Sequence, residues 1–380
     1  MTDMIHQTHD FFKEDNERRL YKPIPIDAGE VDGWKEIPID ACSETLVALG
    51  AFSREAGSIL TSSVYYGEHS SSPYILEYNK LSGALLTVFA REKVAARLLE
   101  AEQLLPERHH LLVFDAYRPV EVQASLYALY RDQLESQRPD MTSEELDIET
   151  QKYVSMPSFD PAKPSPHNTG GSVDLAIVKL DAESEKLVQA IDEELRDGDM
   201  DIEARIRLEM KKSAIVRQHS ILLDFGTAFD HGGERAALTY FEQKIALGEV
   251  LSPEEKEACQ NRRLLYNVMS HVGMQPYFAE WWHFNAPESQ MGSKAAGTAS
   301  ATYGAADFDL SNATHEELRQ EIYKAAVDAQ EKRMGLEAHL ASSAVQIFFS
   351  EILETTGEPR LASQWSTEVI APQFESPAAA

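Results

Sequence analysis

The strongest constraint on the fold of this chain is a glycine pair, Gly170 and Gly171, just before the run SVDLAIV at 172–178. That run alternates and is rich in β-branched residues, so it predicts a strand. His167 precedes the glycines and Asp174 follows them, and on one uninterrupted strand this odd separation would put the two side chains on opposite faces. Glycines allow positive φ and close backbone approach. We therefore expect the chain to fold back and bring His167 beside Asp174, although a plain turn capped by a buried Asp174 fits the same residues.

Further strand and helix signals are mixed along residues 60–286, which predicts an α+β core. Residues 109–117 are typical of a buried strand that runs into Arg118 and Pro119, and Pro119 suits the first turn of a following helix. Another helix is expected at 93–105. Capping boxes, in which Ser or Thr is followed three residues later by Glu, predict two more helix starts. They pair Thr142 with Glu145 and Ser252 with Glu255.

Composition divides the chain into four parts. Residues 1–40 are polar and contain prolines, which is typical of a loosely packed lead-in. Residues 41–286 form the predicted main domain, in which the acidic stretch 181–217 has helical character. Gly, Ala and Ser then dominate, so 287–313 are predicted to be a linker. Helical spacing predicts a helical C-terminal appendage at 314–380.

The charge balance narrows the choice of partners. The chain has 35 Lys and Arg against 63 Asp and Glu, a net charge of −28, and so acidic a surface repels nucleic acid and anionic membranes. No apolar run approaches 18 residues, and the first residues carry no secretory signal. The two cysteines, Cys42 and Cys259, fit a reducing compartment. We therefore expect a cytoplasmic protein with a small-molecule partner, possible homo-oligomerisation, and neither a nucleic-acid nor a membrane partner.

The segment PYFAEWWHF at 276–284 predicts an aromatic strand and carries another histidine. With the histidine and aspartate described above, His283 would give two histidines and one aspartate, leaving the open fourth position of a catalytic zinc site. Glu280 lies three residues earlier, so on a straight strand it would point to the opposite face; we expect an irregular turn at Trp281 and Trp282. Glu280 would then reach a zinc-bound water as general base. The alternative is an edge strand whose tryptophans only pack the core.

Two further charged residues are candidates for contact with a substrate. Arg118 stands where a strand gives way to a helix, and its fixed charge and forked donors suit stabilisation of an oxyanion. The alternative for Arg118 is a surface ion pair with Asp115. Asp230, at the end of DFGTAFD, would bind a substrate ammonium or cap the next helix.

Taken together, five segments resemble the D-alanyl-D-alanine dipeptidases of the VanX type, in the zinc peptidase family M15 that also holds D,D-carboxypeptidases. Their order and chemistry agree with that family over roughly residues 40–286. The segments are DAYRP at 115–119, SPHNTGGSVDL at 165–175, FGTAFD at 225–230, RRLL at 262–265 and EWWHF at 280–284.

The resemblance implies a role for each residue that matches the family pattern. It implies one Zn²⁺ per chain held by three ligands, His167, Asp174 and His283. It implies Glu280 as the base and Arg118 as the group that stabilises the tetrahedral intermediate. It implies two substrate contacts, Ser165 beside the substrate and Asp230 at its amino end. The implied fold is a small antiparallel sheet flanked by helices, similar to the D-Ala-D-Ala peptidases and hedgehog proteins.

The expected function is zinc-dependent hydrolysis of the D-Ala-D-Ala dipeptide or a close analogue. Two alternatives remain open: a D,D- or L,D-carboxypeptidase that acts on longer cell-wall peptides, and a non-catalytic zinc-containing binding protein. The chain departs from compact family members by the 55 residues between Asp174 and Asp230. We expect the extra stretch 181–217 to cover the site, change the accepted substrate length or mediate oligomerisation.

Overall fold

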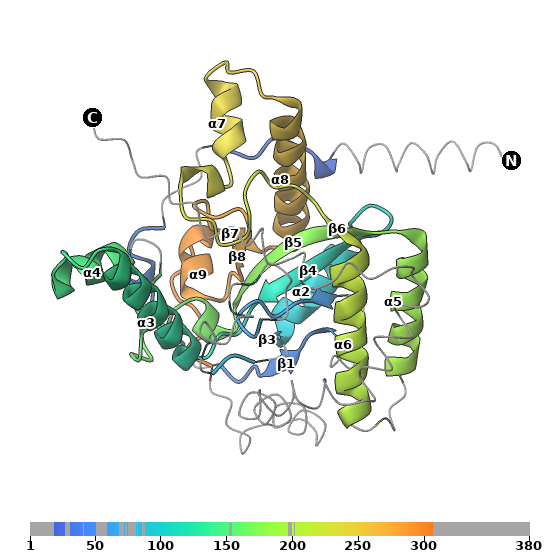
Figure 1. Cartoon of the computed structure of the whole chain (residues 1–380), viewed down its shortest axis with the longest axis horizontal. Helices are drawn as coiled ribbons and strands as arrows, with labels where there is room; N and C mark the ends of the chain where they lie inside the picture. Colours follow the sequence, from blue (N-terminus) through green and yellow to red (C-terminus); the bar gives the residue numbers. More distant parts are fainter. Residues whose placement is uncertain are drawn as a thin grey trace, which may run out of the picture.

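The computed structural model describes residues 19–306 except 27–30, 41, 51–58, 68–71, 73, 75–80, 82, 86–87, 152–153, 197–199 and 201. The expected appendage at 314–380 lies outside the described residues. The described part mixes helices and strands, as the sequence predicted, and Figure 1 shows them gathered around a central sheet.

The central sheet is built around β5 (Ser172–Leu180), the longest strand among the described residues. Its strand order is β2 (Leu60–Thr61), β4 (His109–Asp115), β5, β8 (His283–Asn285) and β7 (Gln275–Pro276), and β6 (Ser220–Leu222) also pairs with β5. The sheet is not purely antiparallel, because β2 runs parallel to β4 while the other pairs are antiparallel. The connection between β2 and β4 contains β3 (Phe89–Arg91) and α2 (Glu92–Glu102), which gives the crossover that parallel strands need. β3 also pairs with β1 (Leu46–Ala48) in a separate antiparallel sheet of two strands.

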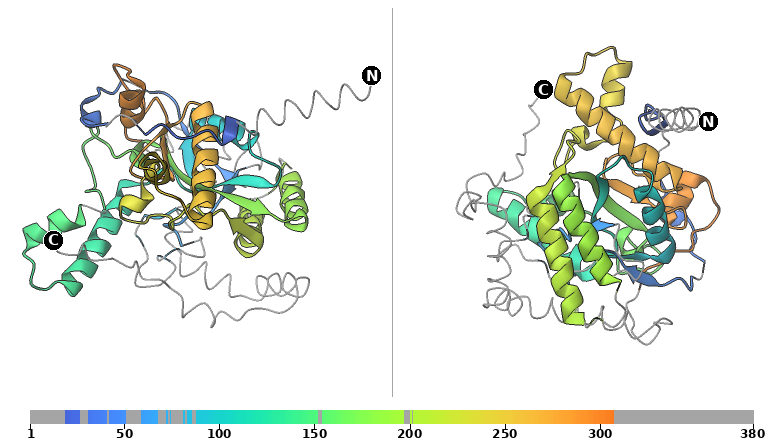
Figure 2. Two further views of the ribbon diagram at one scale, coloured as in Figure 1. Left: turned by 90° about the horizontal axis from the view of Figure 1, so that it is seen from above. Right: turned by 90° about the vertical axis from the view of Figure 1, so that its right-hand side faces the viewer.

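Helices cover both faces of β5. Its side chains from 172 to 178 are all buried, although the sequence alternates there, because neither face of the strand meets solvent. Figure 2 shows α5 (Ala182–Leu195) and α6 (Ile202–His219) on one side of the sheet, and α2 with α8 (Pro253–His271) on the other. The core of the molecule therefore lies in the two layers on either side of β5.

The local helix signals of the sequence are confirmed. Both predicted capping boxes form, at the starts of α4 (Ser143–Thr150) and α8. Pro119 stands at the N-cap of α3 (Val120–Gln137), and α2 buries Val94 and Leu98. α7 (Tyr240–Ala246) precedes α8. Among the helices described, none is both long enough and apolar enough to cross a membrane.

The acidic stretch 181–217 is helical, as predicted, and packs onto the sheet. It comprises α5 and most of α6, which contribute buried apolar side chains to the main core: Val188, Ile191, Leu195, Leu208, Ile215 and Val216. A buried ion pair joins the two helices, with Lys212 Nζ 2.7 Å from Asp192 Oδ1. These contacts make the stretch part of the hydrophobic core.

The aromatic strand predicted at 276–284 is wrong over most of its length. Only its two ends are strands, β7 and β8, and the residues between them turn back so that the two ends pair. The tryptophans explain the difference: Trp281 stacks on Phe225 at 4.1 Å and donates from Nε1 to Thr227 Oγ1, and Trp282 is also buried. Both rings therefore pack into the core from a turn. The edge-strand alternative is wrong as well, since β8 lies between β5 and β7.

The linker predicted from residue 287 onward is wrong for residues 289–306. Ser289 caps α9 (Gln290–Ala296), and Tyr303 is fully buried and bridges to Ser289. Gly292 packs closely against the backbone, because a Cβ added there would come 1.9 Å from the carbonyl oxygen of Ala286. Gly292 therefore permits a close backbone contact, which amino-acid composition alone does not distinguish from flexibility.

The lead-in also packs more closely than predicted where it is described. Ile24 is buried in the main core and its backbone N–H donates to Glu242 Oε1 at 3.0 Å. The carbonyl of Ile37 accepts from Gln290 Nε2 at 2.7 Å. The lead-in therefore packs on the main core through Ile24 and is hydrogen-bonded to the segment after 287 through Ile37.

Candidate metal centre

Three strand ends place charged and ligating side chains in one row across the sheet. In the register of the sheet, Asp115 at the end of β4 faces Asp174 near the start of β5, and Asp174 faces His283 at the start of β8. A register shift between Val113 and Asp115 in β4 precedes this row. Asp115, Asp174 and His283 are far apart in the sequence but lie side by side on neighbouring strands of the sheet.

His167 joins this row through the turn that the glycines allow. It begins the short 3-10 helix η5 (His167–Thr169), which ends at Gly170 with a left-handed φ of +67°. A Cβ at Gly170 would come 2.3 Å from Leu46 Cδ2, and one at Gly171 would come 2.6 Å from Tyr303 Cδ2. Both positions therefore need glycine, and the predicted fold-back of His167 toward Asp174 is what the structure contains.

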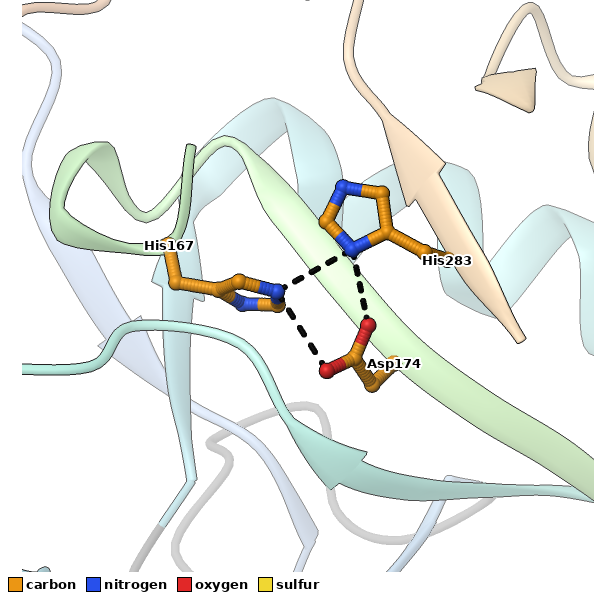
Figure 3. Close-up of side chains that lie close together, drawn as sticks. All are labelled: His167, Asp174 and His283. Carbon is orange, nitrogen blue, oxygen red and sulfur yellow. Dashed lines mark hydrogen bonds and ion pairs between the residues drawn. The ribbon is translucent and has the colours of Figure 1, made fainter. Parts of the chain in front are cut away.

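The three predicted ligands lie together. One ligand atom from each of His167, Asp174 and His283 lies within 4.8 Å of the others, and all three residues are buried. Figure 3 shows the two imidazoles and the carboxylate converging from η5, β5 and β8. Asp174 lies between the rings, with Oδ2 3.3 Å from His167 Nε2 and Oδ1 2.9 Å from His283 Nδ1.

The outer nitrogen of each ring faces an acceptor. His167 Nδ1 lies 2.9 Å from the carbonyl oxygen of Ala116, and His283 Nε2 lies 3.1 Å from Asn285 Oδ1. Asn285 Oδ1 also accepts from Ser172 Oγ at 2.7 Å, which fixes the orientation of the amide. Because these oxygens can only accept, each outer nitrogen donates its ring N–H to the oxygen that it faces. The inner nitrogens, His167 Nε2 and His283 Nδ1, then face each other and Asp174.

This donor set fits a zinc ion. Two imidazole nitrogens and one carboxylate oxygen are ordinary ligands of Zn²⁺, and three protein ligands are the number found in its catalytic sites. Metal-ligating histidines donate their other ring N–H to a carbonyl or carboxylate, as His167 and His283 do here. Burial would raise the pKa of Asp174, but His167 and His283 beside it hold that pKa well below its usual range. Asp174 is therefore a carboxylate and available as a ligand.

Arg118 and Asp115 form a buried pair against this cluster, so the surface-pair alternative is wrong. Their side chains are 11% and 9% exposed, and Arg118 places Nε at 2.9 Å and Nη2 at 2.8 Å from Asp115 Oδ2. Arg118 Nη2 also lies 3.5 Å from Asp174 Oδ2, and its guanidinium lies over the ring of Tyr65 at 4.4 Å. The same Asp115 oxygen is 3.2 Å from His167 Nδ1. Asp115 thus connects the arginine to a predicted ligand.

Glu280 lies in the turn before β8, where its backbone N–H donates to the carbonyl of Tyr277 at 3.1 Å. The turn at Trp281 and Trp282 is the irregularity that the sequence predicted. Burial, aided by the charges of Asp174 and Asp230 and opposed by those of His283 and Arg118, raises the pKa of Glu280 to about 7. The carboxyl therefore stands within electrostatic reach of the cluster and exchanges its proton near neutral pH.

The two predicted substrate contacts occupy different positions around the cluster. Ser165 is buried two residues before His167, and its Oγ accepts from the backbone N–H of Asn168 at 3.4 Å. Asp230 is exposed on the loop after Phe225, with a left-handed φ of 61°. Its charge raises the pKa of Glu280, so Asp230 lies within electrostatic reach of the same site.

Sequence reasoning missed two residues at the site. Asn285 follows His283 by two residues on β8, and that strand spacing, which puts both side chains on one face, could have indicated it. Tyr65 stacks on Arg118 from a turn after β2. No periodicity in the sequence indicates that contact.

Comparisons with known proteins agree with the resemblance. The family model described as D-ala-D-ala dipeptidase matches residues 210–300, which include Glu280 and His283. A D-alanyl-D-alanine dipeptidase from Synechocystis sp. is 24% identical over 269 residues, covering 66% of this chain and 84% of that protein. The predicted resemblance to D-Ala-D-Ala dipeptidases is therefore confirmed, and both matches support a peptidase.

Proposed function

We propose that this chain is a zinc-dependent dipeptidase that hydrolyses D-Ala-D-Ala or a close analogue. The observation that carries the proposal is the buried set of His167, Asp174 and His283 with Glu280 and Arg118 both within electrostatic reach of it. The resemblance and the matched dipeptidase support the substrate class. The roles of the individual residues below are part of the proposal.

The three clustered side chains would hold the metal. His167 offers Nε2, His283 offers Nδ1 and Asp174 offers a carboxylate oxygen, while the outer ring nitrogens stay bonded to Ala116 and Asn285. Zn²⁺ bound there would polarise the scissile carbonyl and lower the pKa of its water. The remaining steps fall to the chain's own groups.

Glu280 is the proposed general base. Its carboxylate takes a proton from the attacking water, and the carboxylic acid then gives that proton to the leaving amine. A pKa raised by burial suits both halves of this cycle, because the group must be a carboxylate before attack and an acid afterwards. A nearby cation would lower this pKa and favour the carboxylate before attack.

Arg118 is the proposed stabiliser of the negative charge that develops on the carbonyl oxygen. Its charge is permanent, so the site holds this positive group at any working pH. Asp115 and the ring of Tyr65 hold the guanidinium in place beside Asp174. Because the guanidinium of Arg118 is already in position, it need not move as the negative charge develops on the carbonyl oxygen.

Ser165 is proposed to contact the substrate, and Asp230 is proposed to bind its amino end. Asp230 would pair with the substrate ammonium, since its carboxylate lies on an exposed loop within electrostatic reach of Glu280. Ser165 would hydrogen-bond the substrate from the turn that also carries His167.

An assay of alanine release from D-Ala-D-Ala by the zinc-loaded protein tests the proposal. L-Ala-L-Ala and the chelator-treated protein serve as controls. Glu280→Gln keeps the shape of the side chain but removes the base, and it should lower kcat by about 10²–10⁴-fold while zinc content stays at one per chain. Release of alanine from a cell-wall pentapeptide but not from the free dipeptide would replace the dipeptidase proposal with a carboxypeptidase. Zinc binding without any hydrolysis would favour the binding protein.

A further inference from the structure

Gln123 is a buried glutamine in the first turn of α3, only 3% exposed, that no motif of the sequence singled out. Its Oε1 accepts from Arg118 Nη1 at 2.7 Å, and its Nε2 donates to the carbonyl oxygen of Ser155 at 2.7 Å. It therefore lies between the arginine of the site and the segment that follows α4. The amide oxygen thus meets a donor, and the amide nitrogen meets an acceptor.

The Ser155 carbonyl sets the direction of this amide. A carbonyl oxygen can only accept, so the NH₂ end of Gln123 must face Ser155. The amide oxygen is then left facing Arg118, whose guanidinium can only donate. A flipped amide would set oxygen against oxygen on one side and donor against donor on the other. The observed orientation is thus the only one that satisfies both neighbours.

The guanidinium is consequently held on two of its edges. Nε and Nη2 are bonded to Asp115, and Nη1 is bonded to Gln123. The ring of Tyr65 lies against its face at 4.4 Å. Gln123 differs from Asp115 in one respect: it accepts the hydrogen bond without adding a negative charge. Asp115 and Asp174 already place two carboxylates beside the single positive charge of Arg118, and a third carboxylate here would make the local charge still more negative.

We propose that Gln123 is a positioning residue, which fixes the plane of the Arg118 guanidinium and preserves its charge for the carbonyl oxygen of the substrate. This inference rests on the proposed function, because it needs Arg118 to act in the transition state. Gln123 itself touches no reacting atom.

Gln123→Met is the main variant, because methionine has a similar length but neither an acceptor nor a donor in the amide position. With D-Ala-D-Ala and zinc-loaded protein, it should lower kcat by about 10–100-fold, the range seen when a residue that orients a metal ligand by a hydrogen bond is removed. KM should change little, because the loss falls on the transition state. Gln133→Met, at an exposed position of the same helix, is the matched control and should leave both constants unchanged.

A double-mutant cycle separates positioning from a structural role. In an Arg118→Lys background the planar fork is gone, so adding Gln123→Met should lower kcat no further. Gln123→Glu, which keeps the acceptor but adds charge and loses the bond to Ser155, should also lower kcat. Equal losses from Gln123→Met in both backgrounds, or a wild-type kcat in the single variant, overturn the inference.

A second readout is independent of activity. In the metal-free protein the ¹⁵N-labelled Arg118 Nε–H signal, assigned by its loss in Arg118→Lys, should exchange with solvent faster in Gln123→Met. An unchanged exchange rate counts against positioning. If the wild-type protein releases no alanine, the proposed function fails and this inference fails with it. If the wild type is active and Arg118→Lys is impaired while Gln123→Met is normal, only the role of Gln123 fails.

Discussion

His167 Nε2 and His283 Nδ1 face each other at 3.1 Å, although the outer nitrogen of each ring already faces an acceptor. With both rings neutral, two lone pairs meet at a distance that only a shared proton or a cation makes favourable. Asp174 adds a carboxylate to the same point. The arrangement is therefore costly when left without a positive charge, which is the physical reason to expect a metal ion there.

Removal of any one of these ligands should remove the metal. We expect one zinc per chain in the wild-type protein, and loss of most of it in His167→Ala, Asp174→Ala and His283→Ala. Asn285→Ala should retain the site but weaken zinc binding by about 10–100-fold, because it only orients His283. Elemental analysis after dialysis checks the content, and zinc near the wild-type level in the ligand variants would show that the ligand set is wrong.

Glu280 should make the stability of the metal-free protein depend on pH. Its pKa in the folded protein is raised to about 7 from an ordinary 4.5, so its contribution is fully present below pH 4.5 and is lost as the pH rises through 7. Glu280→Gln cannot ionise and lacks this loss. The variant should therefore gain stability relative to wild type between pH 5 and 8, by up to about 3 kcal/mol. Urea unfolding of the chelated proteins at pH 5 and at pH 8 measures the difference, and a gap that does not change with pH would mean that the pKa of Glu280 is not raised in the folded protein.

The insertion at 181–217 was expected to cover the site, alter substrate length or mediate assembly. β5 pairs with β6 at residues 178–180 and with β8 at residues 172–174, so α5 leaves the strand at the end away from Asp174. The position of α5 and its buried contacts favour a packing role over a cover for the site.

Ile191→Ala tests that packing role. Ile191 is 2% exposed in α5, so its truncation should lower the free energy of unfolding by about 2–5 kcal/mol. Leu187→Ala, 44% exposed on the same helix, should change it by less than about 0.5 kcal/mol. Neither should alter which peptide lengths are hydrolysed. A broader length profile in Ile191→Ala would instead support the hypothesis that the helices narrow access.

The sequence predicts those parts of the fold that depend on interactions between residues close together in the chain. Both capping boxes and the turn at Gly170 are settled within a few residues, and each forms as expected. The irregular turn expected at Trp281 also forms, and it separates Glu280 from the strand that begins at His283. These elements position four of the predicted site residues.

Long-range pairing accounts for what sequence reasoning missed. The burial of Asp115 and Arg118 depends on β5 lying beside β4, and the order of strands is not encoded in either segment. Gly292 lies in a segment whose composition is typical of a linker, yet its backbone packs closely against Ala286 and Pro287. In both cases a residue type that is compatible with solvent exposure is used in the interior because a distant segment covers it.

Arg118→Lys is the sharpest test of the proposed chemistry. Lysine keeps the charge but loses the planar fork that bonds Asp115 and Gln123 together. If Arg118 stabilises the oxyanion, kcat should fall by about 10²–10³-fold, the effect of losing one oxyanion donor, with little change in KM. Steady-state kinetics on D-Ala-D-Ala measures both constants.

Two companion variants identify the cause of any loss. Arg118→Ala should be at least as slow as Arg118→Lys and still bind zinc, but it leaves Asp115 buried without its cation and should cost about 3–5 kcal/mol of stability. Asp115→Asn keeps an acceptor for Arg118 while weakening the contact with His167 Nδ1, so it should reduce zinc affinity as well as kcat. A lysine variant with near wild-type kcat, accompanied only by lower stability, would reduce Arg118 to a structural partner of Asp115, because a buried ion pair alone predicts a change in unfolding and none in turnover.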